Sequence, residues 1–348
     1  MTERFGIVGG GVLGLGLALR LSALGHEVTV IDQADEIGGL ASAWRIGDVT
    51  WDRHYHVTLA TDDHLLALLE EIGLKDEIEW HHTRTGVFAQ GRLHSVSTPL
   101  ELLRFPPLGL IDKVRLAATL VYAGRVRDWR RLESVPVATW LRRWSGRRTF
   151  DTFWRPLLES KLGEAYRDTS AAFIWATIQR LTAARRRGMT DETFGNVIGG
   201  YGRVFERFHQ VLVERGFGFR LGSMVERVGR TGDAMSIGLA GGETLEFDKV
   251  VVTAASRIAA RMCEGLEPEE TARLEAVRYL GIVCPSVLVR SALPDFYVTN
   301  ITDPGLPFTG VINMAALVGD FDGASLVYLP RYVDPSSPLF EESDAAIE

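Results

Sequence analysis

Three glycines near the start of the chain, Gly9, Gly11 and Gly14, have the spacing of a loop that binds the phosphates of a nucleotide. The first permits a tight turn, the second lets the backbone approach a pyrophosphate, and the third lets a helix pack closely on a strand. The helix that begins at Val12 and Leu13 offers N–H groups without partners and a partial positive charge. This pattern predicts an anion site on the backbone.

The elements needed to position this loop flank it. Residues 4–8 form a short apolar run typical of a buried parallel strand, and leucines recur at helical spacing from residue 13 until Gly25. A second β-rich run, 27–32, ends in Asp32, which is placed to hold the hydroxyl pair of a ribose. No Arg or Lys directly follows Asp32, so a 2′-phosphate, and with it NADP, is disfavoured.

A second glycine pair, Gly38 and Gly39, follows this strand and leads into Leu40, Ala41 and Ser42. The segment resembles the GG motif of the superfamily of FAD-binding amine oxidases, protoporphyrinogen oxidases and phytoene desaturases. In that family the loop brings backbone amides and a hydroxyl near the pyrophosphate and ribityl chain, so the resemblance implies that residues 38–42 bind FAD. Leu40 stands where Arg is frequent, which favours the desaturase-like branch, and Asp32 stands where Glu is usual.

The segment Trp51–His56 is similar to the one that follows the GG motif in desaturases and nucleotide-sugar mutases. The resemblance implies that Arg53, Tyr55 and His56 lie near the flavin. A purely structural role for each of them stays open at this point.

Later segments extend the resemblance over nearly the whole chain, with sharp motifs in residues 5–56 and 198–256. Val225 corresponds to a family position that contacts adenine through its backbone. The family normally closes with a Gly-Asp turn and a helix that points at the flavin ring. Because no glycine-rich helix follows Gly319 and Asp320, we predict an ordinary turn there and expect the flavin-closing element to be missing.

We therefore predict an α/β fold in which a Rossmann-like FAD- or NAD(P)-binding domain carries an inserted, mixed α+β substrate domain. A length of 348 residues suits two domains. The expected FAD-binding domain is discontinuous, and the boundaries are 1–75 and 198–256 for it, and 76–197 and 257–348 for the substrate domain.

Within these domains the pattern predicts a helix over residues 62–72 and a hairpin within residues 76–100, with short runs such as 86–89 and 92–95. Residues 108–190 are predicted to be mostly helical, with N-caps at Ser134 and Asp151.

Composition excludes several classes of protein and binding site. The hydrophobic content of 46% is ordinary for a globular protein, and no run of eighteen apolar residues predicts a membrane-spanning helix. Two cysteines, Cys263 and Cys284, are too few for a disulfide framework, and the eight histidines show no metal-ligand spacing. With a net charge of −7 and no nucleic-acid motif, we expect a cytoplasmic protein that binds no nucleic acid and no metal.

One region departs from this acidic balance. Between Arg104 and Lys161 there are 13 Lys and Arg residues against 5 Asp and Glu, interleaved with Trp and Phe. Solvated helix faces around an aromatic core are the favoured interpretation. The other is a surface for an anionic lipid or a phosphorylated substrate, with residues 107–122 dipping into a bilayer face; the resemblance also implies peripheral membrane contact.

The sequence thus predicts an FAD-dependent oxidoreductase that removes hydride from a C–C or C–N bond of a small, largely apolar substrate. Three alternatives stay open: a redox-neutral flavin mutase or isomerase, a truncated flavin-fold protein without catalytic activity, and an NAD-only dehydrogenase. The substrate and the oligomeric state are not predicted.

Overall fold

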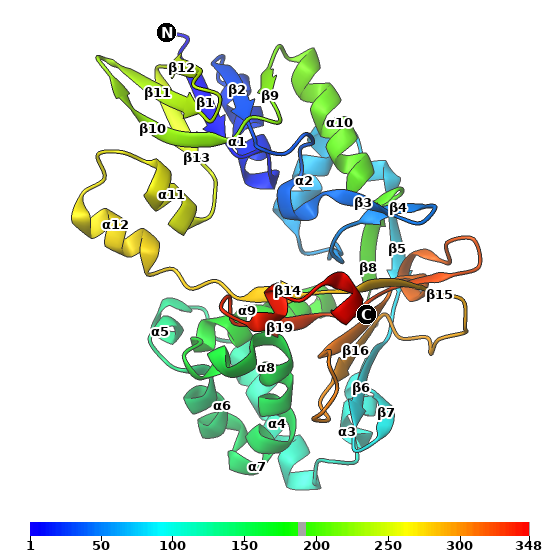
Figure 1. Cartoon of the computed structure of the whole chain (residues 1–348). Coiled ribbons are helices and arrows are strands. Elements are labelled where there is room, and N and C mark those ends of the chain that lie inside the picture. Colours follow the sequence, from blue (N-terminus) through cyan, green and yellow to red (C-terminus); the bar gives the residue numbers. More distant parts are fainter. Residues whose placement is uncertain (187–192, 348) are drawn as a thin grey trace. The chain divides into compact units, whose positions relative to one another are not determined.

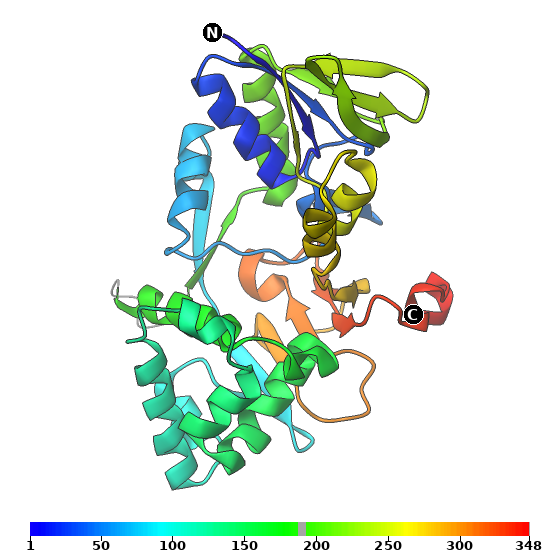
Figure 2. The same ribbon diagram turned by 90° about the vertical axis from the view of Figure 1, so that its left-hand side faces the viewer.

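The computed structural model describes residues 1–186 and 193–347 (Figures 1 and 2). The chain divides into two compact units. Unit 1 comprises Met1–His56, His64–Ile78 and Val197–Arg278, and unit 2 comprises Val57–Asp63, Glu79–Asn196 and Tyr279–Glu348.

Unit 1 is built on a four-stranded parallel sheet with the strand order β13-β1-β2-β9. Its elements are β1 (Arg4–Val8), α1 (Val12–Ala23), β2 (Glu27–Ile31), β3 (Ala43–Ile46), β4 (Val49–Asp52), α2 (Asp63–Glu71), α10 (Gly200–Glu214), β9 (Gly218–Arg220), β10 (Val225–Thr231), β11 (Ala234–Leu239), β12 (Thr244–Phe247), β13 (Lys249–Val252), α11 (Ser256–Met262) and α12 (Pro268–Glu275).

The parallel sheet is buried on both faces, as its β-branched strands require. On one face the side chains of α1, α2 and α10 form a core with Ile7 and Val30, both fully buried. On the other face the antiparallel sheet β10-β11-β12 packs against Val8 and Ile31 (Figure 1). Two layers thus hold the carboxyl ends of β1 and β2 in fixed positions.

The predicted strand–turn–helix–strand unit is confirmed by β1, α1 and β2. Helix α1 ends before Gly25, whose φ of 82° is the left-handed conformation typical of a helix stop. At its other end, Gly14 packs so closely on the loop that a Cβ there would lie 2.0 Å from the carbonyl oxygen of Gly9.

Residues 257–278, which we had placed in the substrate domain, pack instead with unit 1. Helix α11 lies against β10, and the N–H of Glu264 donates to the carbonyl of Val228 over 2.8 Å. Unit 2 therefore resumes at Tyr279, and β5 (Ile78–His82) pairs with β8 (Thr193–Val197) where the chain leaves and re-enters unit 1.

Unit 2 combines a six-stranded mixed sheet, in the order β15-β18-β17-β16-β6-β7, with a helical layer. Its elements are β6 (Thr85–Ala89), β7 (Arg92–Ser95), α3 (Pro99–Arg104), α4 (Leu110–Ala123), α5 (Arg130–Glu133), α6 (Val137–Ser145), α7 (Arg147–Thr149), α8 (Arg155–Leu162), α9 (Ala171–Arg186), β14 (Gly281–Val283), β15 (Ser286–Val289), β16 (Val298–Ile301), β17 (Gly310–Asn313), α13 (Ala315–Val318), β18 (Ser325–Tyr328), β19 (Arg331–Val333) and α14 (Asp344–Ile347).

The predicted hairpin is confirmed by β6 and β7, and the helical region by α4 to α9; residues 187–190 lie outside the described part. Both predicted N-caps are wrong. Ser134 closes α5, because α6 begins only after Pro136. Asp151 lies within a π-helical turn, Phe150–Trp154, which continues directly into α8 and so leaves no helix start to cap. No helix in the described ranges is both long and apolar enough to cross a bilayer.

The contact at Gly14 yields a stability prediction. Gly14→Ala forces a methyl group onto the Gly9 carbonyl, so we expect the free energy of unfolding to fall by about 3 kcal/mol, at the upper end for overpacking. Gly16→Ala is the matched control on the same helix, where a Cβ meets no atom within 4 Å and alanine should add about 0.5–1 kcal/mol. Urea unfolding measures both, and equal stability of the two variants would contradict the packing described here.

Candidate functional site

The first glycine loop is held open by the carboxylate of Asp32. The N–H of Gly10 donates to its Oδ2 over 2.6 Å, and the N–H of Ala34 donates to its Oδ1 over 2.8 Å. Gly9, with φ 116°, turns the chain while its own N–H continues the sheet to the carbonyl of Ile31. The shape of the loop is therefore supported by hydrogen bonds within the protein itself.

Gly11 is the residue of this loop that the fold itself leaves unconstrained. Its φ of −79° and ψ of 178° suit any amino acid, and a Cβ there would meet no atom within 4 Å. It is the N-cap of α1, which has neither a side-chain cap nor an acidic residue in its first turn. The backbone at Gly11, Val12 and Leu13 thus has the open space and the donors that a pyrophosphate needs.

The two glycine motifs form a single structure. The N–H of Gly38 donates to the carbonyl of Gly10 over 2.8 Å, and a Cβ on Gly39 would lie 3.3 Å from the Cα of Gly11. After this contact the chain forms a short 3₁₀ turn, Gly39–Ala41, in which Leu40 is 82% exposed and Ala41 is buried, and Ser42 follows it half-buried.

Val225 is brought to the same end of the sheet by a second contact with the Asp32 segment. The N–H of Ser223 donates to the Asp32 carbonyl over 2.8 Å, and that of Gly222 to the Ala34 carbonyl over 2.9 Å. Val225 itself is 9% exposed at the first position of β10. Every predicted cofactor-binding residue therefore lies in unit 1, around the carboxyl ends of β1 and β2.

We call the joined segments, residues 9–14, 32–34, 38–42 and 222–225, the cradle. Thr253 also belongs to the cradle, although the sequence analysis did not single it out. Its hydroxyl donates to the carbonyl of Val8 at 3.0 Å, with the carbonyl of Gly9 3.3 Å away. A Cβ on Gly9 would lie 2.4 Å from the same hydroxyl. Its place directly after the β-branched run of β13, Lys249–Val252, is the signal that could have identified it.

The three flavin-adjacent candidates follow β4 directly. The N–H of Arg53 donates to the carbonyl of Ser42 over 2.9 Å, which ties this segment to the second glycine loop. The Arg53 guanidinium lies 5.8 Å from the ring centroid of Trp44, and Tyr55 is half-buried. His56 lies against Tyr201 of α10, with ring centroids 5.0 Å apart.

A buried carboxyl group, Asp52, connects His56 to α10. Asp52 is 3% exposed and accepts a hydrogen bond of 2.7 Å from the backbone N–H of Tyr201, and its Oδ2 lies 3.9 Å from Nδ1 of His56. Gly200, with φ 69°, leaves room for it, since a Cβ there would lie 2.8 Å from Oδ1.

Burial shifts the pKa values of Asp52, His54 and His56 in this cluster. Burial raises the pKa of Asp52 to about 7, against the opposing effect of the Tyr201 N–H. Burial lowers the pKa of His56, so its imidazole is neutral at pH 7, and burial and the charge of Arg53 lower the pKa of His54. A carboxyl and an imidazole in these states can hold or exchange a proton. The sequence reasoning missed Asp52; the acid that ends the run Val49–Asp52 was its signal.

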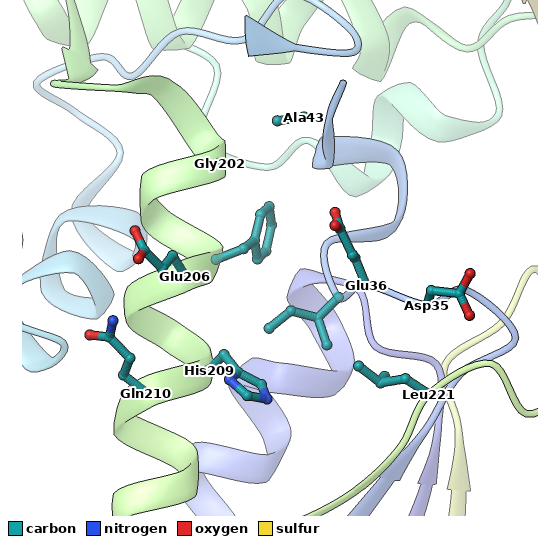
Figure 3. A pocket seen from close by; sticks show the side chains of 10 residues that line it. Asp35, Glu36, Ala43, Gly202, Glu206, His209, Gln210 and Leu221 are labelled. Atoms are coloured by element: carbon teal, nitrogen blue, oxygen red, sulfur yellow. The ribbon is translucent and has the colours of Figure 1, made fainter. Parts of the chain in front are cut away.

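A pocket of about 450 Å³ lies between α10 and the loop that follows β2 (Figure 3). Glu206, His209 and Gln210 of α10 lie on one side of it, and Asp35, Glu36 and Leu221 on the other. Three carboxylates repel a pyrophosphate, and no residue of the first glycine loop lines this pocket. The pocket is therefore distinct from the phosphate cradle.

Comparison with known proteins identifies the family of the chain. The family model for flavin-containing amine oxidoreductases matches residues 14–290. The chain belongs to this family. FAD is accordingly its cofactor, and the open backbone at Gly11 with the uncapped start of α1 fits the FAD pyrophosphate. No group of three or more His, Cys, Asp or Glu side chains converges as for a metal in the described residues.

Two curated relatives show how far the likeness extends. A 15-cis-phytoene desaturase of Synechococcus elongatus is 31% identical over 78 residues, which cover 22% of this chain and 16% of the desaturase. A protein of Mycobacterium tuberculosis described as a flavin-containing monoamine oxidase is 30% identical over 145 residues, 39% of this chain and 32% of the relative. The match thus spans less than half the length of either relative.

Solved structures extend the likeness to the fold. A protein of an Exiguobacterium species described as a protoporphyrinogen oxidase superimposes with a TM-score of 0.75 at 17% identity, over 100% of this chain and 81% of that one. A reduced UDP-galactopyranose mutase superimposes with a TM-score of 0.75 at 18% identity, over 96% and 75%. The predicted Rossmann-like domain with a mixed α+β insertion is confirmed.

The buried Asp52 predicts a pH dependence of stability. Because its pKa is higher in the folded than in the unfolded chain, the folded state binds the extra proton, and stability decreases as the pH rises from about 4 to about 7. Asp52→Asn keeps an acceptor for the Tyr201 N–H and removes the titration. We expect the variant to gain about 2 kcal/mol relative to the wild type between pH 5 and pH 8.

Urea unfolding at these two pH values measures the difference, and Asp62→Asn, at a half-buried position, is the control for loss of one carboxylate. A constant difference between wild type and Asp52→Asn across this range would show that Asp52 is ionised throughout.

Proposed function

We propose that the chain is an FAD-dependent oxidoreductase that removes hydride from a C–C or C–N bond of a largely apolar substrate. Unit 1 would bind FAD and unit 2 would contribute the substrate site. The observation that carries the proposal is Gly11, a glycine that the apoprotein does not require, at the open N-terminus of α1.

The residues of the cradle have separate tasks in this proposal. The backbone N–H groups of α1 bind the pyrophosphate, with the glycine at position 11 giving it access. The Asp32 carboxylate still has lone pairs for ribose hydroxyls after accepting from Gly10 and Ala34. The backbone at Val225, held beside the Asp32 segment, contacts the adenine.

Bound FAD supplies a two-electron acceptor for the hydride, with oxygen or a quinone as the final oxidant. The N–H of Arg53 donates to the carbonyl of Ser42, so the segment that holds Arg53, Tyr55 and His56 is tied to the second glycine loop. This contact supports these three residues as neighbours of the flavin. The neutral imidazole of His56 can accept a proton released from the substrate, and the Asp52 carboxyl at 3.9 Å can stabilise the resulting charge.

The substrate class is supported by the named activities of the relatives, a phytoene desaturase and a monoamine oxidase. These names cover dehydrogenation of a hydrocarbon and oxidation of an amine. The likeness to a UDP-galactopyranose mutase, together with the histidines at positions 54 and 56, supports a redox-neutral mutase or isomerase as the second candidate.

Flavin affinity tests the cradle. Gly11→Ala puts a methyl group into the space reserved for the pyrophosphate, so we expect the Kd for FAD to rise at least roughly tenfold, a loss of about 1.4 kcal/mol, while apoprotein stability stays the same. Gly16→Ala, also in open space but one turn further along α1, should leave the Kd unchanged. Fluorescence titration of the apoprotein with FAD measures both, and equal affinities would argue that the pyrophosphate lies elsewhere.

Flavin reduction separates the candidate functions. Under anaerobic conditions we expect an apolar polyene or amine substrate to bleach the flavin band in a single turnover, because the electrons have no other acceptor. Product formation with the flavin in the same oxidation state before and after each turnover identifies a mutase or isomerase instead. Tightly bound FAD that no candidate substrate reduces or rearranges would favour a flavin-fold protein without catalytic activity.

A further inference from the structure

Helix α4 of unit 2 buries two polar side chains beside the apolar Leu116 and Ala123. Its inward positions, which pack against α6, α7 and α9, include Asp112 at 5% and Thr119 at 1% exposure. The hydroxyl of Thr119 lies 2.9 Å from that of Ser145, and Asp112 accepts from the Thr149 hydroxyl and pairs with Arg148 at 3.3 Å. The polar groups that would usually face water are therefore satisfied inside the unit.

The outward face of α4 is correspondingly apolar. Its members recur at helical spacing and are all exposed in the described structure, with Leu110, Ile111, Val114 and Val121 at 78%, 70%, 61% and 51%. We call this set the α4 stripe, and it consists of Leu110, Ile111, Val114, Ala117, Ala118, Val121 and Tyr122. A continuous apolar stripe about 20 Å long indicates an interaction surface.

Aromatic side chains, and cations without a carboxylate partner among the described residues, lie on α4 and on the helices α6 and α7 that contact it. Tyr122 stacks on Trp144 of the neighbouring α6 with ring centroids 3.8 Å apart, and both rings are more than one-third exposed. Among the described residues, the guanidinium groups of Arg115, Arg143 and Arg147 have no carboxylate oxygen within 4.0 Å. By helix geometry, Arg115 flanks the stripe on one side and Lys113 on the other.

We propose that the α4 stripe docks this protein on the surface of an anionic lipid bilayer. Aliphatic side chains would enter the acyl boundary, the Tyr122–Trp144 pair would lie at headgroup level, and the flanking cations would contact lipid phosphates. A second copy of the chain is a poorer occupant, because pairing this face with itself brings the same uncompensated arginines together. The inference goes beyond the proposed function, since it concerns where the protein encounters an apolar substrate.

Co-sedimentation with vesicles tests the proposal on the purified full chain. We expect the wild type to bind vesicles of phosphatidylcholine mixed with phosphatidylglycerol, and to bind pure phosphatidylcholine vesicles at least roughly tenfold more weakly. Ile111→Gln/Val114→Gln should lower the partition coefficient for the mixed vesicles roughly tenfold or more. Arg143→Gln/Arg147→Gln should remove most of the preference for the anionic lipid.

The control is Val213→Gln/Ile258→Gln, which removes two side chains of 50% exposure from unit 1 and should leave vesicle binding unchanged. All these side chains are exposed, so thermal unfolding should be unaffected; if the Ile111/Val114 variant fails to fold, Leu110→Gln/Val121→Gln tests the same stripe. Sedimentation does not depend on FAD, so failure of the flavin proposal would leave this test intact.

Two results would overturn the proposal. One is that the wild type stays in the supernatant with both kinds of vesicle. This result counts against the proposal both for a monomer and for a dimer that the Ile111→Gln/Val114→Gln variant dissociates. The other is vesicle binding that the stripe variants leave as strong as that of the control.

Discussion

The hydrogen bonds that Asp32 accepts from Gly10 and Ala34 fix the geometry on which the cofactor cradle depends. They hold the first glycine loop at the end of β2, and the Gly38 N–H then docks the second loop on the first. The carbonyl of Asp32 accepts from Ser223 and so positions the Val225 segment as well. One residue thereby organises three stretches of chain that are separated by up to about 200 positions.

The glycines of the cradle divide into two kinds, and the division separates folding from binding. Gly9 and Gly14 are required by the fold, because a side chain at either would clash with Thr253 or with the loop carbonyl. Gly11 meets no such clash and has ordinary dihedral angles, so the fold does not require a glycine there, and the proposed function assigns it to ligand access. Asp52, the last residue of β4, is buried against the start of α10. The free-energy cost of burying its carboxyl group is offset by the hydrogen bond from the Tyr201 N–H, and by a raised pKa that keeps the group partly protonated near pH 7.

Local patterns in the sequence were sufficient to predict the dinucleotide unit, the hairpin and the helical region, because each is set by residues a few positions apart. The same approach failed at Ser134 and Asp151, where tertiary packing decided the helix boundaries. Asp52 was not identified since its partner Tyr201 lies 149 positions away. The exposed face of α4 was only partly accessible: the sequence pointed to residues 107–122 as one possible lipid-facing stretch, but the buried partners of Thr119 and Asp112 lie 26 and 37 positions away.

The absorbance spectrum of the freshly purified protein, followed by mass analysis of what is released on heating, tests the central claim most directly. The account predicts flavin bands in the visible region and a released species with the mass of FAD. A folded protein that is colourless, and that stays colourless after incubation with excess FAD and removal of the unbound cofactor, would contradict it.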